Sequence, residues 1–245
     1  MSHDITLADR IRRELLTSYR KPLFRPFVHA VKSFSMLSPG EHIAVCLAPS
    51  VSSLLLAVLL SLLHAHSDFP FELSVFCPSS PENALTNELA ESLGLSPVPL
   101  MDADAMPDLS SWKMAVSQHF EENVHTILYS MLMEGRLRAL PPKEKLASSE
   151  IIRPLFFLRD ADIRAWADST GIFPPDMPLD MFHPNDTIAS LLAHLQTVFP
   201  DTEKNIFASV QNLDLDTFPE WHAQNPFPPS SIQISMKQSE VPDEE

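Results

Sequence analysis

The sequence predicts an α/β protein with a parallel, twisted β-sheet and helices on both faces. From residue 37 onward, short apolar runs of strand length alternate with longer helical patterns. Residues 42–67 carry no formal charge, which fits a buried strand followed by a buried helix. The four glycines stand at the expected ends of elements or in turns. Alternation of strands and helices is typical of a parallel sheet covered on both sides.

The predicted elements follow from apolar periodicity and from turn residues. Strands are expected at 42–47, 71–77, 97–101, 114–117 and 151–155, the last as an edge strand. Helices are expected at 51–65, 81–93, 120–134, 159–170, 186–198 and 202–211. Ser80 before Pro81 favours a helix N-cap with proline in the first turn. Gly94 and Gly171 favour helix ends, where a residue with positive φ is needed.

Three regions are predicted along the chain. Residues 1–36 form an N-terminal helical arm, residues 37–225 the α/β domain with its C-terminal helices, and residues 226–245 a disordered acidic tail. The arm contains one helix near 7–20 and a second that opens at Pro22. Its basic residues form either a solvated helix face or a docking surface, and they include Arg10, Arg12 and Arg13.

Composition limits the functions that this chain can have. A formal net charge of −15 opposes tight, nonspecific binding to nucleic acid or to an anionic membrane. The uncharged run 42–67 could suggest a membrane span, but Pro49 and five serines favour a buried strand and helix. The N-terminus lacks a signal-peptide core, and Cys46 and Cys77 suggest reduced, buried thiols. We therefore expect a cytoplasmic protein with no membrane partner.

The strand–loop–helix unit 41–60 has the architecture of a phosphate-binding site. Such units usually carry a glycine-rich loop whose backbone N–H groups face the anion. Here the turn has neither glycine nor charge, and it reads Ala48, Pro49, Ser50, Val51, Ser52 and Ser53. Ser52 and Ser53 could hold a weak anion through the helix dipole, or they could simply cap the helix.

Several stretches, taken in order, resemble one known family over most of residues 30–215. They are the lead-in 34–47, the helix and loop 127–142, the segments 152–155 and 159–164, and the helix 207–212. These stretches resemble the tRNA 2-thiocytidine synthetase family (TtcA), a branch of the PP-loop ATP pyrophosphatases. The resemblance implies a PP-loop α/β scaffold.

The family's functional motifs are mostly lost when they are carried over residue by residue. Its phosphate loop, Ser-Gly-Gly-Lys-Asp-Ser, falls on 48–53, where only Ser53 is retained. Of its two Cys-x-x-Cys pairs, the first is missing from the region 105–109 and the second falls on Met177 and Asp180. Neither position offers a thiolate. Its Gly-His-His-Arg-Asp-Asp element falls on 117–122, where His119, Glu121 and Glu122 remain.

Two groups of polar residues remain as candidates for function. His119, Glu121 and Glu122 could bind Mg²⁺ or relay a proton, or the two glutamates could be first-turn acids that the helix dipole favours. The loop after the helix 120–134 carries a second basic patch, which could contact tRNA phosphates and consists of Arg136, Arg138, Lys143 and Lys145.

On these observations we expect a catalytically inactive TtcA-like scaffold that binds a protein or an RNA partner. The alternative is a divergent tRNA-modification protein, thiolation-like and therefore a transferase, that still binds ATP weakly. A third hypothesis is an interaction module whose basic arm docks on an acidic partner. We assign no catalytic residue and no metal site, and we expect no cofactor: no iron–sulfur cluster, and ATP with Mg²⁺ at most weakly.

Overall fold

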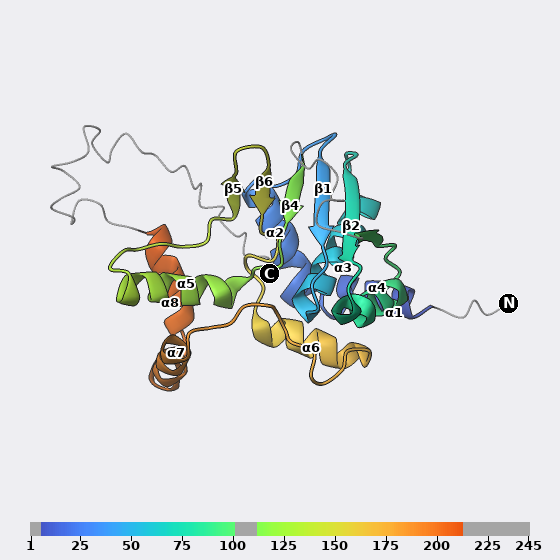
Figure 1. Ribbon diagram of the computed structural model, residues 1–245. Helices are drawn as coiled ribbons and strands as arrows, with labels where there is room; N and C mark the ends of the chain where they lie inside the picture. Colours follow the sequence, from blue (N-terminus) through green and yellow to red (C-terminus); the bar gives the residue numbers. More distant parts are fainter. Residues whose placement is uncertain (1–5, 101–111, 213–245) are drawn as a thin grey trace, which may run out of the picture.

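The fold is a six-stranded, mostly parallel sheet with helices packed around it (Figure 1). It is known from a computed structural model, which describes residues 6–100 and 112–212. Two predictions concern residues outside these ranges: the absence of the first cysteine pair from 105–109 and the disordered acidic tail at 226–245. The α/β class predicted from the sequence is confirmed.

The sheet has the strand order β3-β2-β1-β4-β6-β5. Strands β1 (His42–Cys46) and β2 (Glu72–Pro78) pair in parallel at its centre, and β3 (Val98–Leu100) extends it on one side. On the other side β4 (Lys113–Ala115) pairs in parallel with both β1 and β6 (Glu150–Ile152). After β1 the chain therefore continues toward the β3 edge of the sheet, and after β4 it continues toward the β5 edge.

Strand β6 corrects the prediction that 151–155 is an edge strand. The edge is β5 (Lys143–Lys145), which pairs antiparallel with β6 inside a stretch that was expected to be a loop. The sequence Lys-Glu-Lys carries no apolar alternation, so only pairing with β6 reveals it as a strand. Charged side chains are typical of edge strands, where they oppose pairing with other chains.

The helix that follows β1 is part of the core. Helix α3 (Val51–His66) buries every residue from Val51 to Leu60, as expected for a helix that is apolar on all sides. Ser50, and not Ser52 or Ser53, is its N-cap: the Ser50 Oγ accepts the backbone N–H of Ser53 at 3.4 Å. None of the described helices is both long enough and apolar enough to cross a membrane.

The N-terminal helices pack into the same core as the sheet. Helix α1 (Leu7–Leu16) is followed by a π-helical turn η1 (Arg20–Phe24) and by α2 (Arg25–Ser33), so the second α-helix starts later than Pro22. Buried side chains from all three segments join one apolar cluster with α3, among them Ile11, Leu15, Leu23 and Phe27. Removal of residues 1–32 would therefore take buried side chains out of the core and expose the residues that they cover. The domain boundary at 36 stays a prediction.

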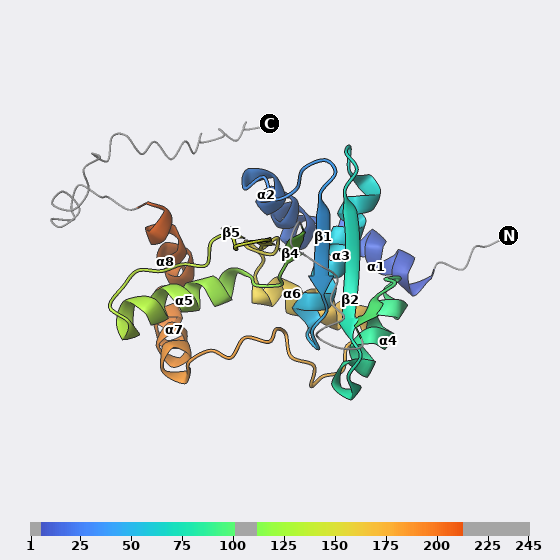
Figure 2. The same ribbon diagram turned by 45° about the horizontal axis from the view of Figure 1, so that its top comes forward.

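The helix expected at 81–93 begins as a short 3₁₀ turn, η2 (Pro81–Asn83), and continues as α4 (Ala84–Ser92). Ser80 makes no side-chain cap to this helix. Helices α6 (Asp160–Thr170), α7 (Asp186–Val198) and α8 (Thr202–Gln211) lie close to their predicted bounds. Helix α5 (Phe120–Met133) packs with α7 and α8 on the β5 side of the sheet, away from α1 and α4 (Figures 1 and 2).

Candidate functional site

The candidate site lies at the carboxyl ends of β1 and β4. These two strands are neighbours whose following connections diverge, and ligands of open α/β sheets usually bind at such a switch point. Ser50 to Ser53 follow β1, and His119 directly precedes α5 after β4. The sequence placed both groups after strands, and the sheet order brings them to the same end of the molecule.

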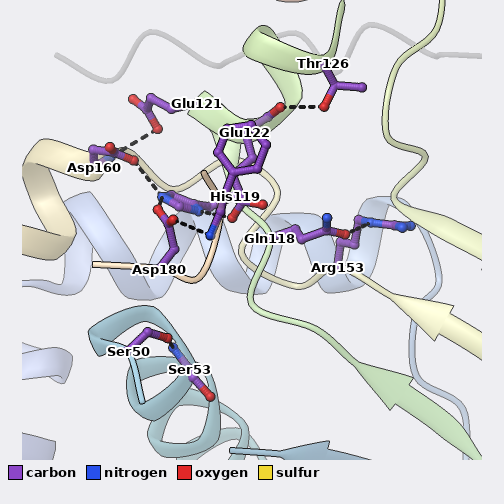
Figure 3. A network of polar contacts seen from close by, with 11 residues as sticks. Ser50, Ser53, Gln118, His119, Glu121, Glu122, Thr126, Arg153, Asp160 and Asp180 are labelled. Carbon is purple, nitrogen blue, oxygen red and sulfur yellow. Dashed lines mark hydrogen bonds and ion pairs between the residues drawn. The ribbon is translucent and has the colours of Figure 1, made fainter. Parts of the chain in front are cut away.

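His119 is a buried imidazole surrounded by three carboxylates (Figure 3). Its Nδ1 lies 2.9 Å from Oε1 of Glu122, one turn along α5. Its Nε2 lies 2.6 Å from Oδ1 of Asp160, at the start of α6, and 3.6 Å from Oδ2 of Asp180. Three separate segments of the chain therefore converge on one ring.

The protonation state of His119 follows from this arrangement. Burial alone would lower its pKa, but hydrogen bonds to Asp160 and Glu122 outweigh burial and raise the pKa of His119 to about 10. The ring is an imidazolium at neutral pH, and both of its N–H groups donate. It therefore acts as the central cation of the site and is a weak general base.

A second layer of charge surrounds Asp160. Glu121 accepts the backbone N–H of Asp160 at 3.1 Å and forms an ion pair with Arg159 at 2.6 Å. Burial, with the charge of Asp160, raises the pKa of Glu121 to about 7 in spite of Arg159. Arg159 also pairs with Glu203 of α8 and lies over the ring of Phe120 at 4.3 Å. These contacts tie α5, α6 and α8 together.

The sequence identified His119, Glu121 and Glu122 and missed the other members of this cluster. Asp160 and Asp180 are 41 and 61 residues away from His119 in the chain; Asp180 was considered only as a position of the family's second cysteine pair, and Asp160 was not singled out. Only the packing of α6 and of the segment after it on α5 places them at the ring. The interpretation of the two glutamates as simple first-turn acids is incomplete, since both make specific contacts.

The turn 48–53, on which the family's phosphate loop falls, is closed by another part of the chain. The N–H groups of Val51 and Ser52, which begin α3 and would face an anion, donate instead to the carbonyls of Pro178 and Leu179 at 3.0 and 2.8 Å. The Ala48 N–H donates to Oγ of Ser53 at 2.9 Å. The first-turn donors of α3 are thus satisfied internally, and Ser50 and Ser52 are fully buried.

The segment that closes the loop also reaches His119. It runs from Met177 to Asp180, where the family's second cysteine pair was placed, and Leu179 is buried. Together with α5, α6 and α7 it borders a cavity of about 490 Å³, which is lined by residues that include Glu122, Asp160 and Asp180. One side of the carboxylate cluster is therefore open to a small molecule or to solvent.

The basic residues do not form one stripe. Helix α1 and the loop that follows α5 lie on opposite sides of the sheet in both views (Figures 1 and 2). In α1, Arg10 and Arg12 donate to the carbonyls of Thr170 and Gly94, and Arg10 and Arg13 are exposed.

Near the loop, Lys143 donates to the Ser35 carbonyl at 2.9 Å and lies 3.6 Å from Glu150. Arg136 and Arg138 are exposed beside Glu134, and Lys145 is exposed on β5. Of the four loop cations, Arg136, Arg138 and Lys145 are thus exposed to solvent, and Arg136 is also paired with Glu134 at 2.7 Å.

A mostly parallel sheet with a strand–loop–helix unit at its switch point defines the class of protein as α/β. The solved structure of the U34-tRNA thiolase NcsA from Methanococcus maripaludis, with its [4Fe-4S] cluster, matches 76% of each chain with a TM-score of 0.54 at 11% identity. No family model matches the sequence.

The chain is related over most of its length to the tRNA-cytidine(32) 2-sulfurtransferases, so its resemblance to the tRNA 2-thiocytidine synthetase family is confirmed. The enzyme of Nitrosospira multiformis is 24% identical over 87% of this chain and 84% of its own. That of Hahella chejuensis is 26% identical over 84% and 85%, and that of Neisseria meningitidis serogroup A is 24% identical over 84% and 77%.

These comparisons correct the expectation that no iron–sulfur cluster is involved, because the structural neighbour is a thiolase that holds a [4Fe-4S] cluster. The donors of this chain do not match the usual ligand set, which is four thiolates. Its two cysteines are Cys46, which is exposed at the end of β1 and not buried as expected, and Cys77, which is buried in β2. We therefore derive no chemical step through a cluster.

Proposed function

We propose that this chain is a tRNA-modification protein of the thiolation type, with tRNA as its macromolecular ligand. The observation that carries the proposal is the similarity to tRNA sulfurtransferases over more than four-fifths of both chains. If the chain is catalytic, the reaction is an ATP-dependent group transfer to tRNA in the cytoplasm.

The tRNA surface that we propose lies at the end of α5 and on β5. Arg136, Arg138 and Lys145 are exposed there, on a protein whose charge is otherwise strongly negative. Each phosphate that a protein cation neutralises releases a counterion, so binding through these side chains must weaken with salt.

A charge-reversal series tests this surface. We expect the triple variant Arg136→Glu, Arg138→Glu, Lys145→Glu to bind tRNA more weakly and to lower the salt slope by about 2 to 3, roughly one for each lost phosphate contact. Arg13→Glu is the control for position, because Arg13 is also exposed but lies on α1. Equal losses in both variants would reject the assignment of tRNA to the α5–β5 side.

We infer that ATP binds weakly at the start of α3. A phosphate group there must first displace the carbonyls of Pro178 and Leu179 from the N–H groups of Val51 and Ser52. Two hydrogen bonds at about 1 kcal/mol each would weaken binding by roughly thirtyfold compared with an open loop. Calorimetric titration with ATP and Mg²⁺ measures this directly, and firm binding at low micromolar concentration would contradict the inference.

The same closed loop favours a second candidate function, a catalytically inactive scaffold that retains tRNA or protein binding. Nucleoside analysis separates the two candidates. In a deletion strain we expect a thiolated tRNA nucleoside to be lost and then restored by the wild-type gene. An unchanged nucleoside profile, together with retained tRNA binding, would leave the scaffold as the function.

A further inference from the structure

The cluster around His119 holds more negative than positive charge. Among the described residues, a chain of ion pairs joins five carboxylates, those of Glu121, Glu122, Asp160, Asp180 and Glu203, to two cations, His119 and Arg159. A third cation, Arg164, lines the adjacent cavity. Partly buried carboxylates are costly unless a cation compensates them. The cavity lined by Glu122, Asp160 and Asp180 gives such a cation a way in.

The spacing of the side chains matches that of metal ligands. Two overlapping triads each bring three ligand atoms within 4.8 Å of one another. One triad consists of His119, Glu122 and Asp180, and the other consists of His119, Glu121 and Asp160. In each case the imidazole and one carboxylate lie together at the start of α5, and the second carboxylate comes from another segment of the chain (Figure 3).

The two triads differ in how far their oxygens are already occupied. Glu121 is held by Arg159 at 2.6 Å and also accepts the backbone N–H of Asp160, so the second triad has little free capacity. In the first triad, Glu122 contacts His119, and Asp180 accepts one backbone N–H, that of Phe182 at 2.8 Å. His119 and Glu122 are also both buried. The first triad is therefore the better metal site.

We propose that His119, Glu122 and Asp180 bind one divalent transition-metal ion, which replaces the proton on one ring nitrogen of His119, because imidazole ligates metals as the neutral ring. A nitrogen and carboxylate donor set without thiolate suits Mn²⁺, Fe²⁺ or Zn²⁺ and does not suit an iron–sulfur cluster. The side of the site that faces the cavity leaves coordination positions for water or for an oxygen of a bound small molecule. The proposal goes beyond the function in tRNA modification and does not depend on it.

The test is a titration of the full chain, freed of metal with EDTA and then dialysed, with Mn²⁺ and with Zn²⁺, by calorimetry. We expect one saturable site in the wild type. Loss of a ligand should weaken binding by at least about tenfold in Glu122→Gln and in Asp180→Asn. Asp168→Asn is the matched control, since Asp168 is an exposed acid on α6 outside the cluster, and its binding should equal that of the wild type.

Three results would overturn the proposal. They are no saturable binding of either ion, wild-type affinity in both ligand variants, and loss of binding in Glu121→Gln alone, which would place the ion in the other triad. Asp180 is half-buried, so Asp180→Asn tests the site even if Glu122→Gln fails to fold. Because the titration contains neither tRNA nor ATP, its outcome is independent of that of the nucleoside analysis.

Thermal unfolding gives a second measurement of the same site. An ion that binds only the folded protein raises the unfolding temperature as its concentration exceeds Kd. We expect Mn²⁺ to raise the unfolding temperature of the wild type and of Asp168→Asn by several degrees, about 2 to 4 °C for each kcal/mol in a chain of this size. Equal increases in Asp180→Asn would contradict binding at this triad.

Discussion

The substitution His119→Gln removes the central cation of the site and keeps a side chain of similar size. In the wild type the imidazolium donates to Glu122 and Asp160 from a fully buried ring. The amide of glutamine leaves these carboxylates without a compensating charge. Breaking a buried ion pair by removal of one partner destabilises proteins by about 3–5 kcal/mol, and we expect a loss of this order at pH 7.5.

The pH dependence of this loss is the sharper prediction. The pKa of His119 is about 10 in the folded protein and 6.5 in the unfolded chain, so the folded state binds more protons between these values. Its contribution to the free energy of unfolding is complete below pH 6.5 and is lost as the pH rises through 10. Between pH 7.5 and 10 the wild type should lose about 3 kcal/mol through this residue.

Urea unfolding of both proteins between pH 7.5 and 10, in the presence of EDTA, measures this difference. Groups outside the cluster contribute equally to both proteins and cancel in the comparison, whereas Glu121, Asp160 and Asp180 lose the charge of His119, so their pKa values rise in the variant. The difference in free energy of unfolding between the wild type and His119→Gln should therefore shrink by about 3 kcal/mol as the pH rises from 7.5 to 10. Two parallel curves would show that His119 is neutral in the folded protein, and the description of the site as an imidazolium cluster would be wrong.

Five further substitutions, two of them controls, test the scaffold by denaturant unfolding. Leu55→Ala in the buried interior of α3 should cost about 2–5 kcal/mol, whereas Leu85→Ala, at a residue that is 44% exposed on α4, should cost under about 1 kcal/mol. Gly94→Ala should destabilise more than Gly135→Ala: both glycines have positive φ, but a Cβ at 94 would meet an arginine side chain of α1 at 2.9 Å, and a Cβ at 135 would meet nothing within 4 Å. Asn185→Ala removes the N-cap of α7 and should cost about 1 kcal/mol, and no loss would mean that the cap is replaced by water.

Elements with a strong local sequence pattern were predictable, whereas an element defined only by its pairing with another strand of the chain was not. Strand β1 and helix α3 follow from a continuous apolar run, because burying that run is favourable in any α/β arrangement. Strand β5 could not be predicted, because Lys143, Glu144 and Lys145 have no strand-like pattern of their own. Likewise Cys46 was expected to be buried as a strand residue, but it lies at the exposed end of β1.

The sequence by itself determined the fold class, the family resemblance and the absence of glycine and charge from the turn 48–53, because these depend on periodicity and on residue identity. It also singled out His119 with its neighbouring glutamates. Only the tertiary structure decided that Asp160 and Asp180 complete the cluster, and that the carbonyls of Pro178 and Leu179 occupy the first N–H groups of α3. The physical reason is that these contacts join residues far apart in the chain, and the packing of α5 and α6 at the sheet's switch point sets their geometry.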